Sequence, residues 1–560
     1  MSDQLLQDAA AVLQPGFVND GPGRAPDWVR RAIADDGLAG VAYYGRNIGE
    51  KLSQTAELSA ALKAENPELL IAVDEEGGDV TRLDVVAGSA YPGNYALGYV
   101  DDVDLTAAVA REIGLLLAGG GINLDYAPDA DVNTNPDNPV IGTRAFGADP
   151  RVVARHTAAY VRGLQSSGVA GCAKHFPGHG DTAMDSHHGL PRVDHTEEGW
   201  AAHLAPFRAA VEAGVKAVMT AHILAPPYDG DAPSTMSRRV LVDLLRGELG
   251  FGGLVVTDGI EMGAIADTYG VPEGTVLAIA AGADAVCVGG GLRDEIDYLT
   301  LRDALIAAVK EGRLPEERLH DAAERVRELG AWTRQRSHVQ EGTDAAGNIG
   351  AGGGGAAGIA GGGERGGDPI GLIAARRAIE VVGAPLAPLA GPATVLEFSP
   401  AANNAAGAAV PWGLGPVLDR LPVGSTVLRF GRPGDVTDFA GDAAALPDSD
   451  VDLDSTPAAE RPSQDAVPYT PSAVGEAAAA ASGRPLILVV RDAHRHPWMG
   501  EALRAAATVR PDAIVVETGV AYGLTEKSVG ATLIASHGAA RVCGLAVAEV
   551  LVAGSGDGAS

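Results

Sequence analysis

Eight short apolar runs constrain the fold of the first part of the chain more than any other feature. They are separated by longer Ala-, Leu- and Arg-rich segments of helical character, and they lie at residues 12–17, 38–44, 69–73, 122–127, 169–173, 217–220, 254–257 and 283–288. Continuous rather than alternating apolar residues indicate strands that are buried on both faces, as in a parallel sheet covered by helices. Eight strand–helix repeats predict a (β/α)8 barrel of the TIM type, and a doubly wound parallel sheet is the alternative.

A glycine-rich stretch divides the chain into two parts. Residues 347–367 consist mostly of Gly and Ala, a composition typical of a flexible linker. We therefore predict a barrel domain over 1–340, a linker over 341–368 and a C-terminal α/β domain over 369–560. Within the last of these, the patterns predict a helix at 371–382 and strands at 394–398, 426–430, 486–490 and 513–517. The Pro-, Asp- and Ala-rich stretch 435–472 is not assigned regular structure.

Composition and charge limit the partners. The formal net charge is −31 and no basic stripe is visible, which argues against nucleic acid and anionic membranes as partners. Aromatic residues make up only 4% of the chain, too few for wide stacking platforms. The three isolated cysteines suit free thiols in a reducing compartment, and the N-terminus resembles no secretory signal. We predict a cytoplasmic location, while nothing in the sequence indicates an oligomeric state.

Polar residues follow five of the eight runs. The strand-end segments begin at Asp74, Asp125, Lys174, Ala221 and Asp258. Active sites of barrels lie at the C-terminal ends of the strands, formed by the loops that follow them. Five such endings on one rim predict a catalytic pocket rather than five unrelated turns.

The segment from Lys174 to Pro191 contains most of the chemistry. Its ionisable side chains are Lys174, His175, His179, Asp181, Asp185, His187 and His188. Pro177 and three glycines exclude a regular helix. The polarity of the segment predicts a loop after the apolar run 168–173 rather than a buried strand. Histidines and carboxylates on a loop at a strand end suit acid–base chemistry near neutral pH.

These residue types favour a sugar as the ligand. A pocket lined by Asp, Arg, Lys and His, with few aromatics, suits a small, neutral, hydroxyl-rich molecule. Cleaving a glycosidic bond needs one group to protonate the leaving oxygen and one carboxylate to trap or stabilise the oxocarbenium-like centre. Asp258 directly follows the buried run 253–257 and is the best placed nucleophile.

The 174–191 segment resembles a family signature, Lys-His-[Phe/Ile]-Pro-Gly-[His/Leu]-Gly-x4-Asp-[Ser/Thr]-His-x3-Pro. This is the signature of the bacterial β-N-acetylglucosaminidases of glycoside hydrolase family 3. Other blocks that resemble the family, in its order, are Pro15–Phe17, Gly45–Ile48, Asp74–Arg82, Ile141–Gly147, Met219–His222, Ser234–Ser237, Thr257–Met262 and Ala540–Glu549. The last block resembles the end of the family's α/β sandwich domain, so the resemblance covers nearly the whole chain.

The resemblance implies a retaining exo-β-N-acetylglucosaminidase that uses neither cofactor nor metal. Asp258 would be the nucleophile that forms a covalent glycosyl-enzyme, His187 the acid/base and Asp185 the group that orients His187. Histidine, with a reference pKa of about 6.5, can donate and then accept a proton near neutral pH. A neighbouring carboxylate fixes its tautomer and favours the imidazolium. The implied sugar-binding residues are Asp74, Arg82, Arg144, Lys174 and His175.

Several alternatives stay open at this point. Cell-wall fragments, chito-oligosaccharides and glycoconjugate ends all present a terminal β-linked GlcNAc, and the sequence does not separate them. Phosphate could replace water as the acceptor, which would make the protein a phosphorylase. A non-catalytic sugar-binding protein on the same scaffold would be expected to lack Asp258 or His187, and both are present.

Two further groups of histidines could form a metal site or a second site. A metal hydrolase could use His175, His179, Asp185 and His187, but Pro177 and Gly178 exclude a helical His-x3-His site. In the second part of the chain, the cluster from Asp492 to His496 follows a predicted strand. We interpret it as a solvated loop rather than as a second site. His179 and His188 are expected to stabilise the loop or to lie at its rim.

Overall fold

The computed structural model covers the 560-residue chain. It describes residues 3–187, 189–290, 294–346, 368–400, 405, 410–432, 466–524 and 532–554. Contacts divide the chain into two compact units, described separately below. The first comprises Met1–Glu76, Asp102–Ile141 and Ala145–Gly366, and the second comprises Gly77–Asp101, Gly142–Arg144 and Gly367–Ser560.

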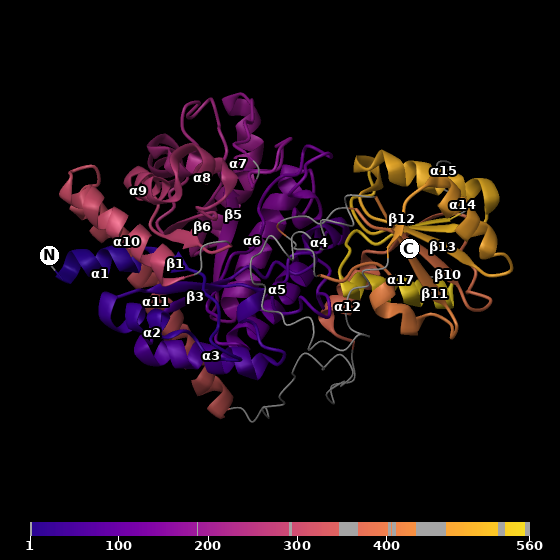
Figure 1. Ribbon diagram of the computed structural model, residues 1–560, viewed down its shortest axis with the longest axis horizontal. Coiled ribbons are helices and arrows are strands. Elements are labelled where there is room, and N and C mark those ends of the chain that lie inside the picture. Colours follow the sequence, from indigo (N-terminus) through magenta and orange to yellow (C-terminus); the bar gives the residue numbers. More distant parts are fainter. Residues whose placement is uncertain are drawn as a thin grey trace. The chain divides into compact units, whose positions relative to one another are not determined.

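Eight parallel strands form the centre of the first unit (Figure 1). They are β1 (Leu13–Pro15), β2 (Gly40–Tyr43), β3 (Leu70–Val73), β4 (Leu124–Asp125), β5 (Ala170–Phe176), β6 (Ala217–Thr220), β7 (Leu254–Thr257) and β8 (Val286–Val288). Strands β2 to β7 are neighbours in chain order, and β1 pairs with β8. A parallel bridge from Val256 to Ala285 joins β7 to the start of β8. All residues of the eight strands are buried, as the continuous apolar runs predict.

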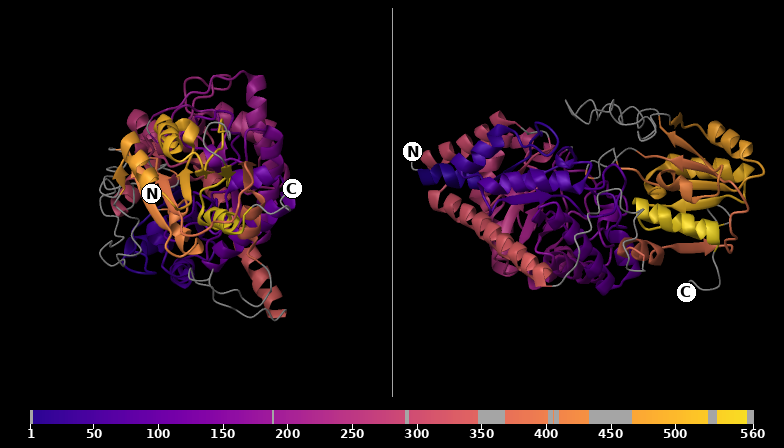
Figure 2. Two further views of the ribbon diagram at one scale, coloured as in Figure 1. Left: turned by 90° about the vertical axis from the view of Figure 1, so that its right-hand side faces the viewer. Right: turned by 90° about the horizontal axis from the view of Figure 1, so that it is seen from below.

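The helices of the first unit surround these strands (Figures 1 and 2). They are α1 (Asp3–Ala11), α2 (Asp27–Arg31), α3 (Leu52–Glu65), α5 (Val103–Gly119), α6 (Pro150–Ser166), α7 (Glu197–Glu212), η5 (Arg239–Glu248), α8 (Gly263–Tyr269), α9 (Val271–Ala281), α10 (Glu295–Lys310) and α11 (Glu316–Ala346). Side-chain caps fix several of their starts, since Asp102 begins α5 and Thr196 begins α7 by accepting backbone N–H groups. The TIM-type barrel is confirmed, and the doubly wound alternative is wrong, because β2 to β7 are parallel neighbours in chain order and the first strand, β1, pairs with the last, β8.

One strand is longer than predicted. β5 continues to Phe176, so Lys174 and His175 lie in a strand and not in the loop that their polarity predicts. Their backbone groups pair with the neighbouring segment, since the N–H of Lys174 donates to the carbonyl of Pro128 at 3.1 Å. Polar side chains are tolerated in a buried strand where partners satisfy them, and such partners are present here.

The second unit contains a seven-stranded sheet in the order β12-β11-β10-β13-β14-β15-β9. Its strands are β9 (Glu380–Gly383), β10 (Thr394–Phe398), β11 (Thr426–Gly431), β12 (Val467–Pro468), β13 (Leu486–Val490), β14 (Ile514–Glu517) and β15 (Thr532–Ala535). All neighbouring strands are parallel except β9, which runs antiparallel to β15. Alternate residues of β13 enter two separate apolar clusters, one on each face of the sheet.

Helices cover both faces of this sheet. The cluster with Leu488 includes residues of α14 (Pro471–Ala480) and α15 (Pro497–Val509), and the cluster with Ile487 includes residues of α17 (Arg541–Ala553). Figure 1 shows the sheet between these helices. The unit is therefore the α/β sandwich that the family resemblance implies.

Two predictions for the second unit need correction or fall outside the described residues. The helix predicted at 371–382 ends early, because α12 spans Ile370–Arg377 and residues 380–383 form β9. The β-branched Val381 and Val382 favour a strand, and pairing with β15 decides the outcome. The predicted linker core 347–367 and most of 435–472 lie outside the described residues, so the domain boundaries stay a prediction. In the part of the chain that is described, no helix is both long enough and apolar enough to cross a membrane.

Candidate active site

Polar residues gather where the barrel strands end. Asp74 directly follows β3, Asp125 ends β4, and Asp258 directly follows β7. His222 comes two residues after β6. Because parallel strands of a barrel end on the same rim, these groups share one end of the first unit.

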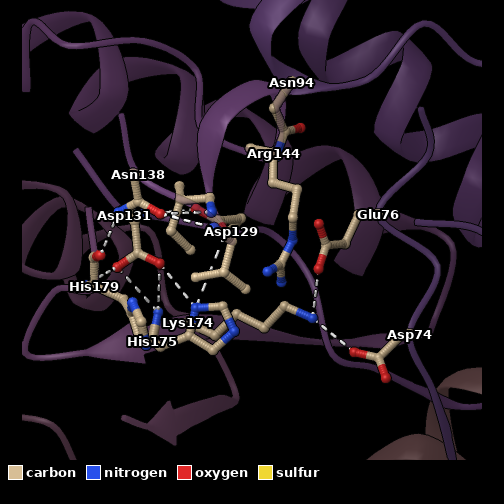
Figure 3. A network of polar contacts seen from close by, with 12 residues as sticks. Asp74, Glu76, Asn94, Asp129, Asp131, Asn138, Arg144, Lys174, His175 and His179 are labelled. Carbon is tan, nitrogen blue, oxygen red and sulfur yellow. Dashed lines mark hydrogen bonds and ion pairs between the residues drawn. The ribbon is translucent and has the colours of Figure 1, made fainter. Parts of the chain in front are cut away.

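Lys174 is a buried cation held between two carboxylates (Figure 3). Its Nζ lies 2.6 Å from Oδ1 of Asp74 and 2.7 Å from Oε1 of Glu76. The side chains of Lys174 and Glu76 are each 2% exposed, whereas that of Asp74 is 26% exposed. A buried charge is costly unless it is paired, so the two carboxylates explain how a lysine is accommodated inside β5. Of the three groups, Asp74 keeps the most access to solvent.

Asp131 binds the end of β5 and the start of the following loop (Figure 3). Its Oδ2 lies 2.8 Å from Nδ1 of His175, and its Oδ1 accepts the backbone N–H of His179 at 2.6 Å. Burial opposes ionisation of Asp131, but the hydrogen bond and the charge of His175 outweigh burial and lower the pKa of Asp131. The carboxylate therefore fixes the ring orientation of His175, one of the residues predicted to bind sugar.

The predicted dyad is present as a hydrogen-bonded pair. Nδ1 of His187 lies 2.7 Å from Oδ1 of Asp185, and the same oxygen accepts the backbone N–H of His187 at 2.9 Å. The His187 side chain is 35% exposed and that of Asp185 is 12% exposed. With Nδ1 directed at the carboxylate, Nε2 is the ring nitrogen suited to exchange a proton with a ligand.

Asp258 is an ionised carboxylate in a group of histidines. Its Oδ1 accepts the backbone N–H of Gly259 at 2.8 Å. Burial raises the pKa of a carboxylate, but here His175, His222 and His187 outweigh burial and lower the pKa to about 2. The three histidines that act on Asp258 come from β5, from the segment after β6 and from the 185–187 loop, so these parts of the first unit meet around Asp258. An ionised carboxylate can act as a nucleophile, and a neighbouring histidine–carboxylate pair can donate the proton that the leaving group needs.

His222 supports the backbone next to Asp258. Its Nε2 lies 2.9 Å from the carbonyl oxygen of Gly259, and its Nδ1 lies 2.8 Å from Oγ1 of Thr235. Burial lowers the pKa of His222, so a neutral ring donates to the carbonyl and accepts from the hydroxyl. His222 is thus a packing and positioning residue in this structure.

Two predicted sugar-binding residues, Arg82 and Arg144, belong to the second unit. Within that unit, a guanidinium nitrogen of Arg82 donates to the carbonyl of Ala405 at 3.0 Å. Arg144 is 7% exposed, and its carbonyl accepts a hydrogen bond from Nδ2 of Asn94 at 2.7 Å. Figure 3 labels Arg144 and Asn94. A sugar-binding role for the two arginines stays a prediction.

Metal-ligand spacing occurs at one place among the described residues. Ligand atoms of Asp129, Asp131 and His175 lie within 4.8 Å of one another. Hydrogen bonds from His175 and His179 already occupy the Asp131 carboxylate. The set considered from the sequence differs, since Nδ1 of His187 is bonded to Asp185 and both ring nitrogens of His179 have hydroxyl partners. His188 lies outside the described residues.

The Asp492–His496 cluster is built into a turn of the second unit. Asp492 has a left-handed backbone with φ of 52°, and its Oδ1 accepts the N–H of Val520 at 2.8 Å. The buried Glu517 accepts the N–H groups of Asp492 and Ala493. Burial, together with the charge of Asp492, raises the pKa of Glu517 to about 7. These contacts give the cluster a structural explanation.

Sequence reasoning missed three residues of the first unit. Glu76 pairs with Lys174, Asp131 holds His175 and His179, and Ser186 contacts the ring of His179. Glu76 and Ser186 lie inside blocks that were already singled out. Asp131 gives a weaker signal, as the second aspartate, after Asp129, in the short stretch that follows β4.

Comparison with known proteins identifies the relatives of this chain. The model of the glycosyl hydrolase family 3 N-terminal domain matches residues 4–329. A β-hexosaminidase of Stenotrophomonas maltophilia is 40% identical over 272 residues, which cover 47% of this chain and 78% of that protein. β-Hexosaminidase A of Pseudoalteromonas piscicida is 35% identical over 305 residues, 51% of either chain, so the alignment spans about half of that relative.

A solved structure resembles the whole chain. It is a glycoside hydrolase family 3 β-N-acetylglucosaminidase from a Paenibacillus species, with 31% sequence identity and a TM-score of 0.75. The match covers 98% of this chain and 96% of that one. Fold, family model and relatives agree with the resemblance found in the sequence motifs, and the predicted enzyme class is confirmed. The chain belongs to glycoside hydrolase family 3.

Proposed function

We propose that this protein is a retaining exo-β-N-acetylglucosaminidase that removes terminal β-linked GlcNAc. The observation that carries the proposal is the combination of an ionised Asp258 with the hydrogen-bonded His187–Asp185 pair. The first supplies a nucleophile and the second supplies a proton donor, the two functions that glycoside cleavage requires. The printed names of the relatives, β-hexosaminidases and a β-N-acetylglucosaminidase, support the choice of sugar.

The proposed reaction has two steps. In the first, Asp258 attacks the anomeric carbon while Nε2 of His187 protonates the leaving oxygen, which gives a glycosyl-enzyme and the free aglycone. In the second, the now neutral His187 takes a proton from water, which attacks the same carbon and releases GlcNAc and Asp258. Asp185 orients the ring and stabilises the imidazolium in both steps. Asp74, Lys174 and His175 are the first-unit groups proposed to bind sugar hydroxyls.

Water is the proposed acceptor, and phosphate is the alternative. At the second step Asp258 is esterified and uncharged, but Lys174 is paired with two carboxylates, which leaves this group of first-unit residues with a net negative charge. An anionic acceptor would approach like charges in a buried environment, where repulsion is weakly screened. This electrostatic balance favours neutral water, although a neutral His187 would oppose phosphate less than a carboxylate would.

The natural aglycone and the location are also proposals. Cell-wall fragments or chito-oligosaccharides are the proposed substrates, with a cytoplasmic role in recycling cell-wall material as the preferred setting. The presence of both Asp258 and His187 speaks against a non-catalytic sugar-binding protein.

Mass spectrometry of the products tests the proposal. The enzyme is incubated with chitobiose and with GlcNAc-anhydromuramyl fragments, in buffers with and without millimolar phosphate. We expect free GlcNAc in both buffers, at rates independent of phosphate. GlcNAc-1-phosphate as the main product would refute hydrolysis while keeping the roles of the residues. No product from either substrate would refute the choice of sugar.

A further inference from the structure

We propose that the hydrogen bond between Ser186 and His179, here called the latch, positions the 185–187 loop next to the segment that begins at Asp258. Neither residue transfers a proton in the proposed reaction, so both are positioning residues. The inference rests on the proposed function, because it takes His187 as the acid/base. It concerns how the loop that holds His187 is kept in place.

His179 is the fixed part of the latch (Figure 3). Its backbone N–H donates to Oδ1 of Asp131 at 2.6 Å, and its carbonyl accepts from Nδ2 of Asn138 at 2.9 Å. The residue is 2% exposed. Asp131 also holds His175 at the end of β5. The backbone of His179 is therefore tied to Asp131 and Asn138 in the segment that follows β4.

The ring of His179 joins this fixed point to the dyad. Its Nδ1 lies 2.9 Å from Oγ1 of Thr182, and its Nε2 lies 3.1 Å from Oγ of Ser186. Burial lowers the pKa of the ring to about 4, so it is neutral near pH 7. A neutral ring accepts at one nitrogen and donates at the other, which two hydroxyl partners satisfy.

Ser186 also connects the loop to α8 through its backbone. It lies between Asp185 and His187 in the chain, and it is 2% exposed. Its carbonyl accepts the N–H of Ala264, in α8, at 3.2 Å. An added Cβ at Gly263 would lie 2.7 Å from the carbonyl oxygen of His187, so this close approach requires a residue without a side chain.

The latch therefore connects the two proposed chemical groups. α8 begins five residues after Asp258, so the backbone contact at Ala264 links the loop to the nucleophile segment. The ring of His179 links the same residue to the end of β5. Ser186 is held by both links, and its immediate neighbours are the two members of the dyad. Loss of the Ser186 hydroxyl would leave the hydrogen bond between Asp185 and His187 intact, but the pair would no longer be held in a fixed position relative to Asp258.

The test compares the dependence of variants on the leaving group. Ser186→Ala should lower kcat/KM for chitobiose by about 10- to 100-fold, as expected for a lost hydrogen bond that leaves a buried ring nitrogen unsatisfied. Hydrolysis of a 2,4-dinitrophenyl β-GlcNAc glycoside should fall by less than about threefold, because this aglycone departs with little protonation. Retained activity on the activated substrate also shows that the variant is folded.

Four further variants separate a latch from general stabilisation. Ser186→Thr keeps the hydroxyl and His179→Gln places an amide near the Nε2 position, so both should recover most of the chitobiose activity. Gly263→Ala should mimic Ser186→Ala by pushing the loop away. The double variant Ser186→Ala/His179→Ala should be no worse than the poorer single variant by more than about threefold, because both remove one interaction. Met184→Ala, on the same loop and 50% exposed, is the control without effect.

Several outcomes would overturn the latch. Equal losses on both substrates, no loss in Ser186→Ala, or losses that multiply in the double variant would each contradict it. His187→Ala is measured in parallel to separate this failure from that of the proposed function. If His187→Ala does not lower the rate of chitobiose hydrolysis, the acid/base assignment is wrong, and the proposed role of the latch is refuted together with it. If His187→Ala behaves as an acid variant and Ser186→Ala does not, only the latch is refuted.

Discussion

Replacing His179 should change how the stability of the protein depends on pH. The residue is 2% exposed, and burial lowers its pKa from 6.5 to about 4. In the unfolded chain a histidine takes up a proton near its reference pKa of about 6.5. Between these two values the unfolded state binds a proton that the folded state does not bind. The free energy of unfolding therefore falls as the pH drops through this window.

The size of the effect follows from the pKa shift. One pKa unit corresponds to about 1.4 kcal/mol, so a pKa of about 4 in place of 6.5 costs the folded state up to about 3 kcal/mol in acid. His179→Gln takes up no proton in either state, so this cost disappears. Between pH 7 and pH 4.5 the variant should lose about 2–3 kcal/mol less free energy of unfolding than the parent.

Urea unfolding at four or five pH values measures this difference, with tryptophan fluorescence and circular dichroism as probes. His320→Asn is the matched control, because a hydrogen bond and the charge of Asp8 raise the pKa of His320. A raised pKa contributes stability below the unfolded pKa that is lost as the pH rises through the folded pKa. The control should therefore lose more stability than the parent toward acid. Parallel curves for the parent and His179→Gln would refute the reasoning.

Four other predictions concern the site and the second unit. Asp258→Ala should lower kcat by at least about 1,000-fold with the fold intact by circular dichroism, and more than a tenth of the parental kcat would contradict its assignment. Since the pKa of Asp258 is about 2, the acid limb of its ionisation should lie below pH 4 in a profile of kcat/KM on an activated glycoside. His187→Ala should impair chitobiose far more than dinitrophenyl glycosides, and equal impairment would argue against a proton donor. His494→Ala/His496→Ala should keep kcat/KM within a few-fold, and a loss above about 100-fold in a folded variant would give the second unit a direct role.

The barrel could be predicted because its signal is local. Most of its strands lie within short apolar runs, which indicate strands that are buried on both faces. The predicted and observed strands at 217–220 and 254–257 agree residue for residue. The helix predicted at 371–382 failed for the opposite reason, because β9 exists only through pairing with β15, some 150 residues away. A local sequence pattern contains no information about a partner strand that lies so far away in the chain.

The site was predictable at the strand ends and less so within the strands. Asp258 could be singled out because charge after an apolar run is visible in a few residues, whereas the Asp185–His187 pair follows from the resemblance of the 174–191 segment to the family signature. Lys174 was assigned to a loop because an isolated lysine would not be stable in a buried strand. Asp74 and Glu76, which pair with it, lie 100 and 98 residues earlier in the chain. Only the folded barrel brings these charges together.

The two halves of the segment from Lys174 to His187 are held differently, and the difference suits the tasks proposed for them. Lys174 and His175 belong to a strand, and buried carboxylates fix both side chains. A strand within a sheet does not move without breaking its ladder, so the half that we propose to bind sugar is rigid. The acid/base half stands on a loop, where the His187 side chain is 35% exposed and the neighbouring Ser186 hydroxyl bonds to His179. Ser186 is also held by the N–H of Ala264, so individual hydrogen bonds rather than a strand ladder position the dyad. A rigid sugar site beside an acid on a loop would keep selectivity for the terminal sugar while accepting different leaving groups.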